Sequence, residues 1–217
     1  TPPTVYQVTA VPNPTNDNTS SYTFHSNDVG TITYGGSCSS NSNDNISVVG
    51  NNTITFNALP DGTYNNCTVR VTSSNGVTSD SLSVSSFTID TTAPTLSQVT
   101  AVTSPTNDTM PSYTFSSNEA GTISYGGSCK VDWVTSTYTG SLTIRFNTLS
   151  EGSYSNCTIT VTDSALNASS ALSVNTFVID TTAPTVSSVT SSTNNATYKI
   201  NDNITVTVTF NDNVTVD

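Results

Sequence analysis

Short runs of alternating apolar and polar residues make up most of the chain, and Asn, Asp, Gly or Pro bounds each run. An alternation with a period of two is typical of β-strands that bury one face, and the sequence has no sustained helical period. The pattern predicts strands in two similar sets and a final pair: residues 5–11, 21–26, 31–35, 53–57, 63–72 and 82–89; residues 96–102, 112–117, 122–126, 142–147, 153–162 and 172–179; and residues 185–190 and 204–210.

The predicted strands recur as a set with a period of about ninety residues. Residues 21–38 return as residues 112–129 with four substitutions, and residues 87–95 return as residues 177–185. Solenoid repeats of roughly 20–50 residues cannot bury a core alone, whereas about ninety residues is close to the size of an independent sandwich domain. The expected units are therefore 1–91, 92–181 and an incomplete third unit at 182–217.

Alternation also predicts which side chains of the first unit face the core. The inner positions of its predicted strands are Tyr22, Phe24, Ile32, Tyr34, Ile54, Phe56, Cys67, Val69 and Val71. Leu82 and Val84 fall out of phase with Phe87 and Ile89, so we expect a β-bulge near residues 85–86.

The four cysteines fall as one pair in each complete unit, Cys38 with Cys67 and Cys129 with Cys157. One pair per unit favours an intradomain disulfide over a four-cysteine metal site. Only 33% of the residues are hydrophobic, so a small core would need such a cross-link. Disulfides form in oxidising compartments, and we therefore expect an extracellular protein, either secreted or displayed on a cell surface.

The charge balance argues against several classes of partner. The chain has 15 acidic and 4 basic residues, a net charge of -11, and no basic cluster that would neutralise phosphates or anionic lipids. We therefore expect neither nucleic-acid binding nor membrane insertion. His25 is the only histidine and is expected on the surface; no nucleophile, base and orienting group recur in both units, so we do not expect an enzyme.

Four motifs, taken in order, resemble the bacterial immunoglobulin-like tandem repeats of large extracellular surface adhesins. They are Tyr113-Thr-Phe-Ser-Ser-Asn-Glu-Ala-Gly-Thr, Glu151-Gly-Ser-Tyr, Val161-Thr-Asp-Ser-Ala-Leu-Asn and Phe177-Val-Ile-Asp-Thr-Thr-Ala-Pro. The resemblance implies an all-β chain of tandem Ig-like antiparallel β-sandwiches, displayed outside the cell as a stalk or spacer. The chain departs from the family in its paired cysteines and in Ser73, which stands where the second unit has Asp163.

Acidic residues cluster where an Ig-like fold would bring two units together. In such a sandwich the loops after the second and sixth strands lie at the pole that faces the preceding unit. Asp90, at the end of the first unit, should therefore meet Glu119 and Asp163 of the second. Carboxylates repel one another unless a cation lies between them, and Ca²⁺ prefers carboxylate and amide oxygens. We expect interdomain calcium there, with Asn118 and Asn167 as further ligands.

The same reasoning places Asp180 and Asp212 together at the second joint. Calcium shared across a four-residue linker would turn a flexible string of neighbouring Ig-like domains into a stiff rod. The alternative is that these acidic side chains only solvate turns, where Asp and Asn are favoured for local hydrogen bonds.

Two other functions remain open. Residues 39–50 and 130–140, between the cysteines, differ most between the units, and Trp133 and Tyr138 of the second loop are candidates for binding a glycan or a surface protein. The favoured alternative is that both rings pack near the disulfide. The incomplete third unit is interpreted first as a truncated domain; alternatively its strands pair with another copy of the chain by strand addition, as in a filament subunit.

Overall fold

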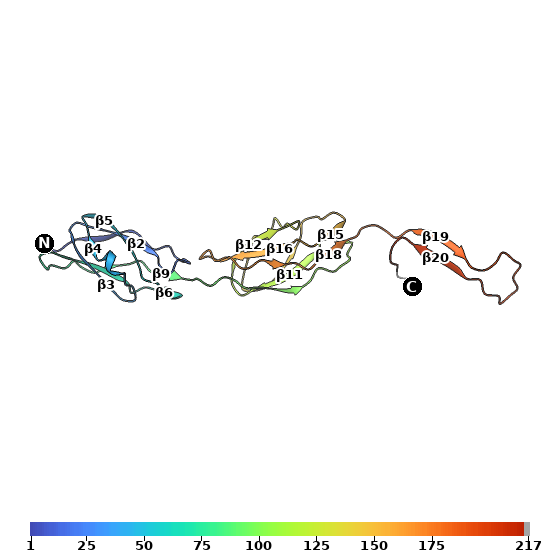
Figure 1. Ribbon diagram of the computed structural model, residues 1–217, viewed down its shortest axis with the longest axis horizontal. Coiled ribbons are helices and arrows are strands. Elements are labelled where there is room, and N and C mark those ends of the chain that lie inside the picture. The colour runs from blue at the N-terminus through green and yellow to red at the C-terminus, as the bar shows by residue number, and fades with distance from the viewer. Residues whose placement is uncertain (215–217) are drawn as a thin grey trace.

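The computed structural model describes residues 1–214, and the strands in this range pair antiparallel with one another (Figure 1). Two sandwich units and a two-stranded hairpin follow one another along the long axis of the molecule. A single 3₁₀ turn, η1 (Ser42–Asp44), accompanies the strands in this part of the chain. None of the described segments forms a helix that could span a membrane.

Both units have the strand order of an Ig-like sandwich. The strands of the first unit are β1 (Val5–Thr9), β2 (Ser21–Ser26), β3 (Gly30–Gly35), β4 (Ile46–Ser47), β5 (Gly50–Thr55), β6 (Gly62–Tyr64), β7 (Thr68–Ser73), β8 (Leu82–Ser83) and β9 (Phe87–Ile89). One sheet has the order β1-β2-β5 and the facing sheet the order β4-β3-β7-β8, while β6 pairs with β9. This is the division between an A-B-E sheet and a C′-C-F-G sheet that defines Ig-like domains.

The second unit repeats this order strand by strand. Its strands are β10 (Leu96–Thr100), β11 (Ser112–Ser117), β12 (Gly121–Gly126), β13 (Ser136–Thr137), β14 (Gly140–Arg145), β15 (Gly152–Tyr154), β16 (Thr158–Thr162), β17 (Leu172–Ser173) and β18 (Phe177–Ile179). Its sheets are β10-β11-β14 and β13-β12-β16-β17, with β15 paired to β18. The expected tandem sandwiches are therefore confirmed.

The alternation of the sequence correctly identified the core. Every inner position predicted for the first unit is buried except Tyr34, which is half-buried and donates its hydroxyl proton to the carbonyl of Asp44. Each unit has its own cluster of buried aromatic and aliphatic side chains. The disulfides join Cys38 to Cys67 and Cys129 to Cys157, and all four sulfurs belong to these clusters.

Two predicted long strands in each unit are interrupted. The range 63–72 divides into β6 and β7, and the range 82–89 divides into β8 and β9. The reason is a change of partner: β6 pairs with β9, whereas β7 and β8 pair within the four-stranded sheet. At residues 85–86, where we expected a bulge, the chain leaves one sheet for another. The short strands β4 and β13 were not predicted, because two residues cannot show an alternation.

The final hairpin consists of β19 (Val186–Ser191) and β20 (Val206–Phe210). It is paired as the first two strands of each unit are, and Thr185 N donates to Asn211 Oδ1 at 2.6 Å. The same contact joins Thr95 N to Asn118 Oδ1 in the second unit, also at 2.6 Å. All residues of β19 and all residues of β20 except Phe210 are exposed, so this hairpin covers no core. Locally it reproduces the start of a sandwich unit.

Candidate metal centre

Three carboxylates from two units meet at the first joint, the linker of residues 91–94. Asp90 follows β9, Glu119 lies in the turn between β11 and β12, and Asp163 follows β16. One oxygen from each lies within 4.8 Å of the others. The strand order explains the meeting, because the turns after β11 and β16 lie at the pole of the second unit that faces the end of β9.

Asp163 is the most rigidly held of the three. Its side chain is buried, and its two oxygens accept hydrogen bonds from the backbone and side-chain nitrogens of Asn167 at 2.9 and 2.8 Å. The turn between them contains Leu166 at a φ of 74°, a left-handed conformation that is costly for Leu. Gly76 has the corresponding place in the first unit, at a φ of 75°. The second unit thus accepts backbone strain in the turn that carries Asp163.

Asn167 also connects the two units directly. Its Nδ2 donates to the backbone carbonyl of Asp90 at 2.8 Å, in addition to its bond with Asp163. Asp90 Oδ1 meanwhile accepts from Thr92 N at 3.1 Å. Asp90 is therefore held from both sides of the joint.

The unfavourable electrostatics of this arrangement raise the pKa of Glu119. Desolvation by burial raises the pKa of its carboxyl, the negative charges of Asp90 and Asp163 raise it further, and a hydrogen bond from Asn118 partly opposes them. This bond joins Asn118 Nδ2 to Glu119 Oε1 at 3.3 Å. The three carboxylates therefore destabilise one another in the absence of a cation.

The donor set fits a divalent cation. Two oxygens on opposite sides of a Ca²⁺ ion, each at about 2.4 Å, are separated by about 4.8 Å. The three carboxylate oxygens lie within that limit of one another. Three hard, charged oxygen ligands suit Ca²⁺ and Mg²⁺ rather than soft metals. The remaining ligands of a six- to eight-coordinate ion would be second carboxylate oxygens and water.

The two asparagines expected as ligands are oriented otherwise. Asn118 Oδ1 accepts from Thr95 N, and Asn167 presents its nitrogen, not its oxygen, to the joint. Both side chains position the carboxylates instead of adding to the donor set. The reason is that the Thr95 N–H and the Asp90 C=O, on either side of the linker, compete for the same amides.

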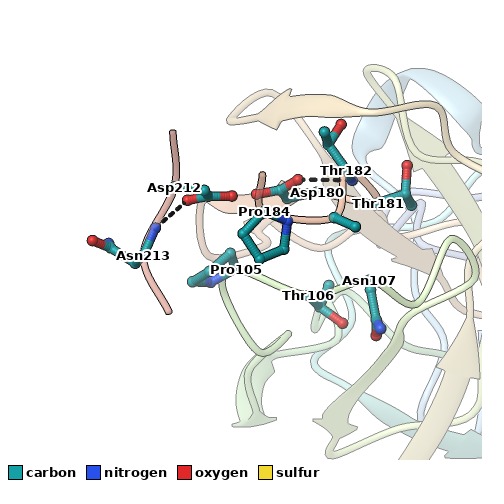
Figure 2. Close-up of a pocket in the computed structure, with 10 residues that line it drawn as sticks. Pro105, Thr106, Asn107, Asp180, Thr181, Thr182, Pro184, Asp212 and Asn213 are labelled. Carbon is teal, nitrogen blue, oxygen red and sulfur yellow. Dashed lines mark hydrogen bonds between the residues drawn. The ribbon is translucent and has the colours of Figure 1, made fainter. Parts of the chain in front are cut away.

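The second joint, the linker of residues 181–184, brings together two of the expected carboxylates. Asp180 and Asp212 line an open groove of about 380 Å³ together with Pro105, Pro184 and neighbouring residues. Figure 2 shows their carboxylates pointing toward one another across the groove. Within residues 1–214, a cluster of three carboxylates forms only at the first joint.

The remaining candidates lie away from the joints. Trp133 and Tyr138 are 55% and 60% exposed, and neither belongs to the buried cluster that contains the disulfide. His25 lies on β2, half-buried, and stacks on Tyr6 of β1 with ring centroids 4.7 Å apart. The corresponding pair in the second unit is Ser97 and Ser116.

Sequence reasoning missed one functional feature of the joints. Asp61 accepts hydrogen bonds from Thr91 and Thr92 of the first linker, and Glu151 accepts them from Thr181 and Thr182 of the second. The available signal was an acidic residue before Gly in both units, at 61–62 and 151–152, about thirty residues ahead of each Thr pair.

The chain is similar to known proteins in structure and, over part of its length, in sequence. The structure is similar to fibronectin(III)-like modules of Clostridium thermocellum CbhA, with 12% identity and a TM-score of 0.41, over 82% of this chain and 93% of that chain. At that TM-score the fold assignment rests on the strand order alone. No curated protein sequence matches the chain. Residues 139–216, about a third of the chain, are similar to the family model of the bacterial Ig-like domain (group 3).

Proposed function

We propose that the chain is a structural spacer in the stalk of an extracellular, adhesin-like protein, and that calcium stiffens its joints. The observation that carries the proposal is the meeting of Asp90, Glu119 and Asp163 across the first linker. The two disulfides support an oxidising, extracellular location. Each unit has a core of its own, so the joint can be stiffened without rearranging either domain.

The mechanical effect follows from the charges. Without a cation the three carboxylates favour separation of the units; desolvation by burial raises the pKa of Glu119 most, and the charges of Asp90 and Asp163 raise it further. A bound divalent ion converts the same three groups into attachments that hold the end of β9 to the pole of the second unit. The ion thus restricts the bending of the joint.

Small-angle X-ray scattering of the full chain in CaCl₂ and in EDTA tests this proposal. We expect a longer maximum dimension and a narrower distance distribution with calcium, and identical curves in both buffers would contradict it. Asp163→Ser introduces the residue of the first unit and should lower calcium affinity at least tenfold by calorimetry, since it removes one charged ligand. Asp80→Asn, an exposed carboxylate beside the pocket of Pro2 and Pro3, is the control.

A second candidate function is glycan or protein binding by the loop of the second unit. The exposed rings of Trp133 and Tyr138 favour it, because neither is needed for the core. Binding to a glycan array that is lost in Trp133→Ala and kept in His25→Ser would support it. An array with no bound glycan would remove the glycan form of this proposal.

A third candidate is pairing between copies of the chain through the hairpin. In each complete unit a third strand, β5 or β14, pairs with the free edge of the second. Within residues 1–214 no strand pairs with that edge of β20. Polymers that form with the full chain but not with residues 1–181 would support strand addition, and a monomer at all concentrations would exclude it.

A further inference from the structure

Each linker begins with two threonines that bind one exposed carboxylate of the preceding unit. At the first joint, Asp61 Oδ1 accepts from Thr91 N at 3.0 Å and from Thr91 Oγ1 at 2.8 Å. Asp61 Oδ2 accepts from Thr92 Oγ1 at 2.9 Å. A single side chain from the turn before β6 therefore fixes both residues with which the linker starts.

The second joint reproduces this arrangement with a longer acidic side chain. Glu151 Oε2 accepts from Thr181 N at 3.4 Å and from Thr181 Oγ1 at 2.9 Å. Its two oxygens also accept from Thr182 Oγ1 at 3.0 and 2.8 Å. The aspartate of one unit and the glutamate of the other reach the same three donors, so the contact recurs although the residue differs.

The other end of each linker is held by an amide of the following unit. Thr95 N donates to Asn118 Oδ1, and Thr185 N donates to Asn211 Oδ1. Between the two attachments at the first joint lie only Ala93 and Pro94, and Pro94 has a restricted φ and is buried. Little backbone freedom remains in the linker.

The hydrogen bonds strengthen the acidic character of both carboxyls. Donation from the threonines lowers the pKa of Asp61 and of Glu151 below their ordinary values. Both groups are therefore ionised at neutral pH, and their bonds to the threonines are charge-assisted. Thr92 N also donates to Asp90 Oδ1, and Thr182 N to Asp180 Oδ1, which closes the network at each joint.

We propose that Asp61 and Glu151 form carboxylate clamps, which set the direction in which the linker leaves each unit without any cation. The clamp lies entirely on the upstream side of the joint, whereas the carboxylates of Asp90, Glu119 and Asp163 meet across the joint, one from the first unit and two from the second. Calcium then tightens a joint whose orientation is already restricted. The proposal extends the spacer role, but its test is made in EDTA and does not depend on calcium binding.

The test compares three variants of the full chain in EDTA by NMR. Asp61→Ala should accelerate hydrogen exchange of the Thr91 amide by about tenfold, the loss expected for a charge-assisted hydrogen bond. The same variant should decouple the alignment of the first two units in residual dipolar couplings. Asp61→Glu should restore both readouts, because Glu151 makes the same contacts. Asp80→Ala removes an exposed charge at the other pole and is the matched control.

Unchanged alignment of the units in Asp61→Ala would overturn the proposal, as would an equal loss of alignment in Asp80→Ala. Glu151→Ala provides an independent measurement in the same molecule. It should accelerate exchange at Thr181 and leave Thr91 unaffected, and the reverse result would also overturn the clamp. If calcium proves not to bind, these outcomes keep their meaning, because no step of the measurement includes it.

Discussion

Replacing Tyr22 with Phe should stabilise the first unit, although the change removes a polar group from its core. Tyr22 is completely buried, burial raises the pKa of its hydroxyl to about 12, and the hydroxyl is left without a hydrogen-bond partner among the described residues. The equivalent Tyr113 is equally buried, but it donates to Gln98 Oε1 at 3.3 Å. The same substitution should therefore have opposite effects in the two units.

The difference arises from one side chain on the neighbouring strand. Gln7 corresponds to Gln98, but it bonds with Ser85, and its Oε1 accepts from both the backbone and the hydroxyl of that residue. In the second unit Asn175 has the place of Ser85 and bonds with the backbone of Val102. Gln98 is then available to Tyr113. Ser85 thus occupies Gln7 Oε1, the acceptor to which the Tyr22 hydroxyl would otherwise donate.

The magnitude follows from the cost of an unpaired group. An unsatisfied buried hydroxyl costs about 1–3 kcal/mol, whereas a satisfied one contributes about 0.5–1.5 kcal/mol. Allowing for the small void left by the oxygen, we expect Tyr22→Phe to stabilise the first unit by about 1 kcal/mol. Tyr113→Phe should destabilise the second unit by about 0.5–1 kcal/mol. For a domain of this size, 1 kcal/mol changes the midpoint of thermal unfolding by about 4–8 °C.

Scanning calorimetry, with hydrogen exchange to assign each transition to its unit, measures both effects. Tyr22→Phe should raise the transition of the first unit and leave the second unchanged. Ser85→Asn should release Gln7 and remove the benefit of Tyr22→Phe in the double variant. If Tyr22→Phe lowers the transition of the first unit as Tyr113→Phe lowers that of the second, the hydroxyl has a partner and the reasoning is refuted.

Four further predictions concern the joints and the cross-links. Asn167→Val, the residue at the same place in the first unit, removes the bond to the Asp90 carbonyl and should destabilise the second unit by about 1 kcal/mol and increase motion between the units, measured by denaturation and scattering. The stabilisation that Asp61 and Glu151 give the linkers through their hydrogen bonds should be complete above the unfolded pKa of about 4. It should be lost as the pH falls through their lowered folded pKa values, and NMR titration of the Thr91 and Thr181 amides checks this. The pKa of Glu119 is raised in the folded state, so its effect on stability has the opposite sign: the repulsion among the three carboxylates is relieved as the pH falls through that pKa. Calcium affinity, measured by calorimetry at a series of pH values, should decrease over this range. Finally, Cys38→Ala with Cys67→Ala should destabilise the first unit by about 3–4 kcal/mol in urea unfolding, and an unchanged midpoint would contradict the chain-entropy argument.

The features that follow from local alternation could be predicted from the sequence. Tyr22 and Phe24 point inward and Thr23 outward because successive side chains of a strand face opposite sides, whatever the rest of the fold does. The disulfide pairing followed from the period of the repeat, since each unit contains two cysteines. The fold class itself was recognisable because the same short strands occur in the same order twice.

The features that depend on partners distant in the sequence were decided only by the tertiary structure. Nothing in residues 63–72 shows that β6 pairs with β9 and β7 with β3, because a change of sheet leaves the alternation intact. Likewise, Asp61 is an ordinary turn residue until the fold brings Thr91 and Thr92 to it. The amides of Asn118 and Asn167 could serve a metal or the backbone, and the Thr95 N–H and Asp90 C=O groups on either side of the linker decided between them. A periodic pattern states which face a side chain occupies, whereas a hydrogen bond depends on which group the folded chain places within reach.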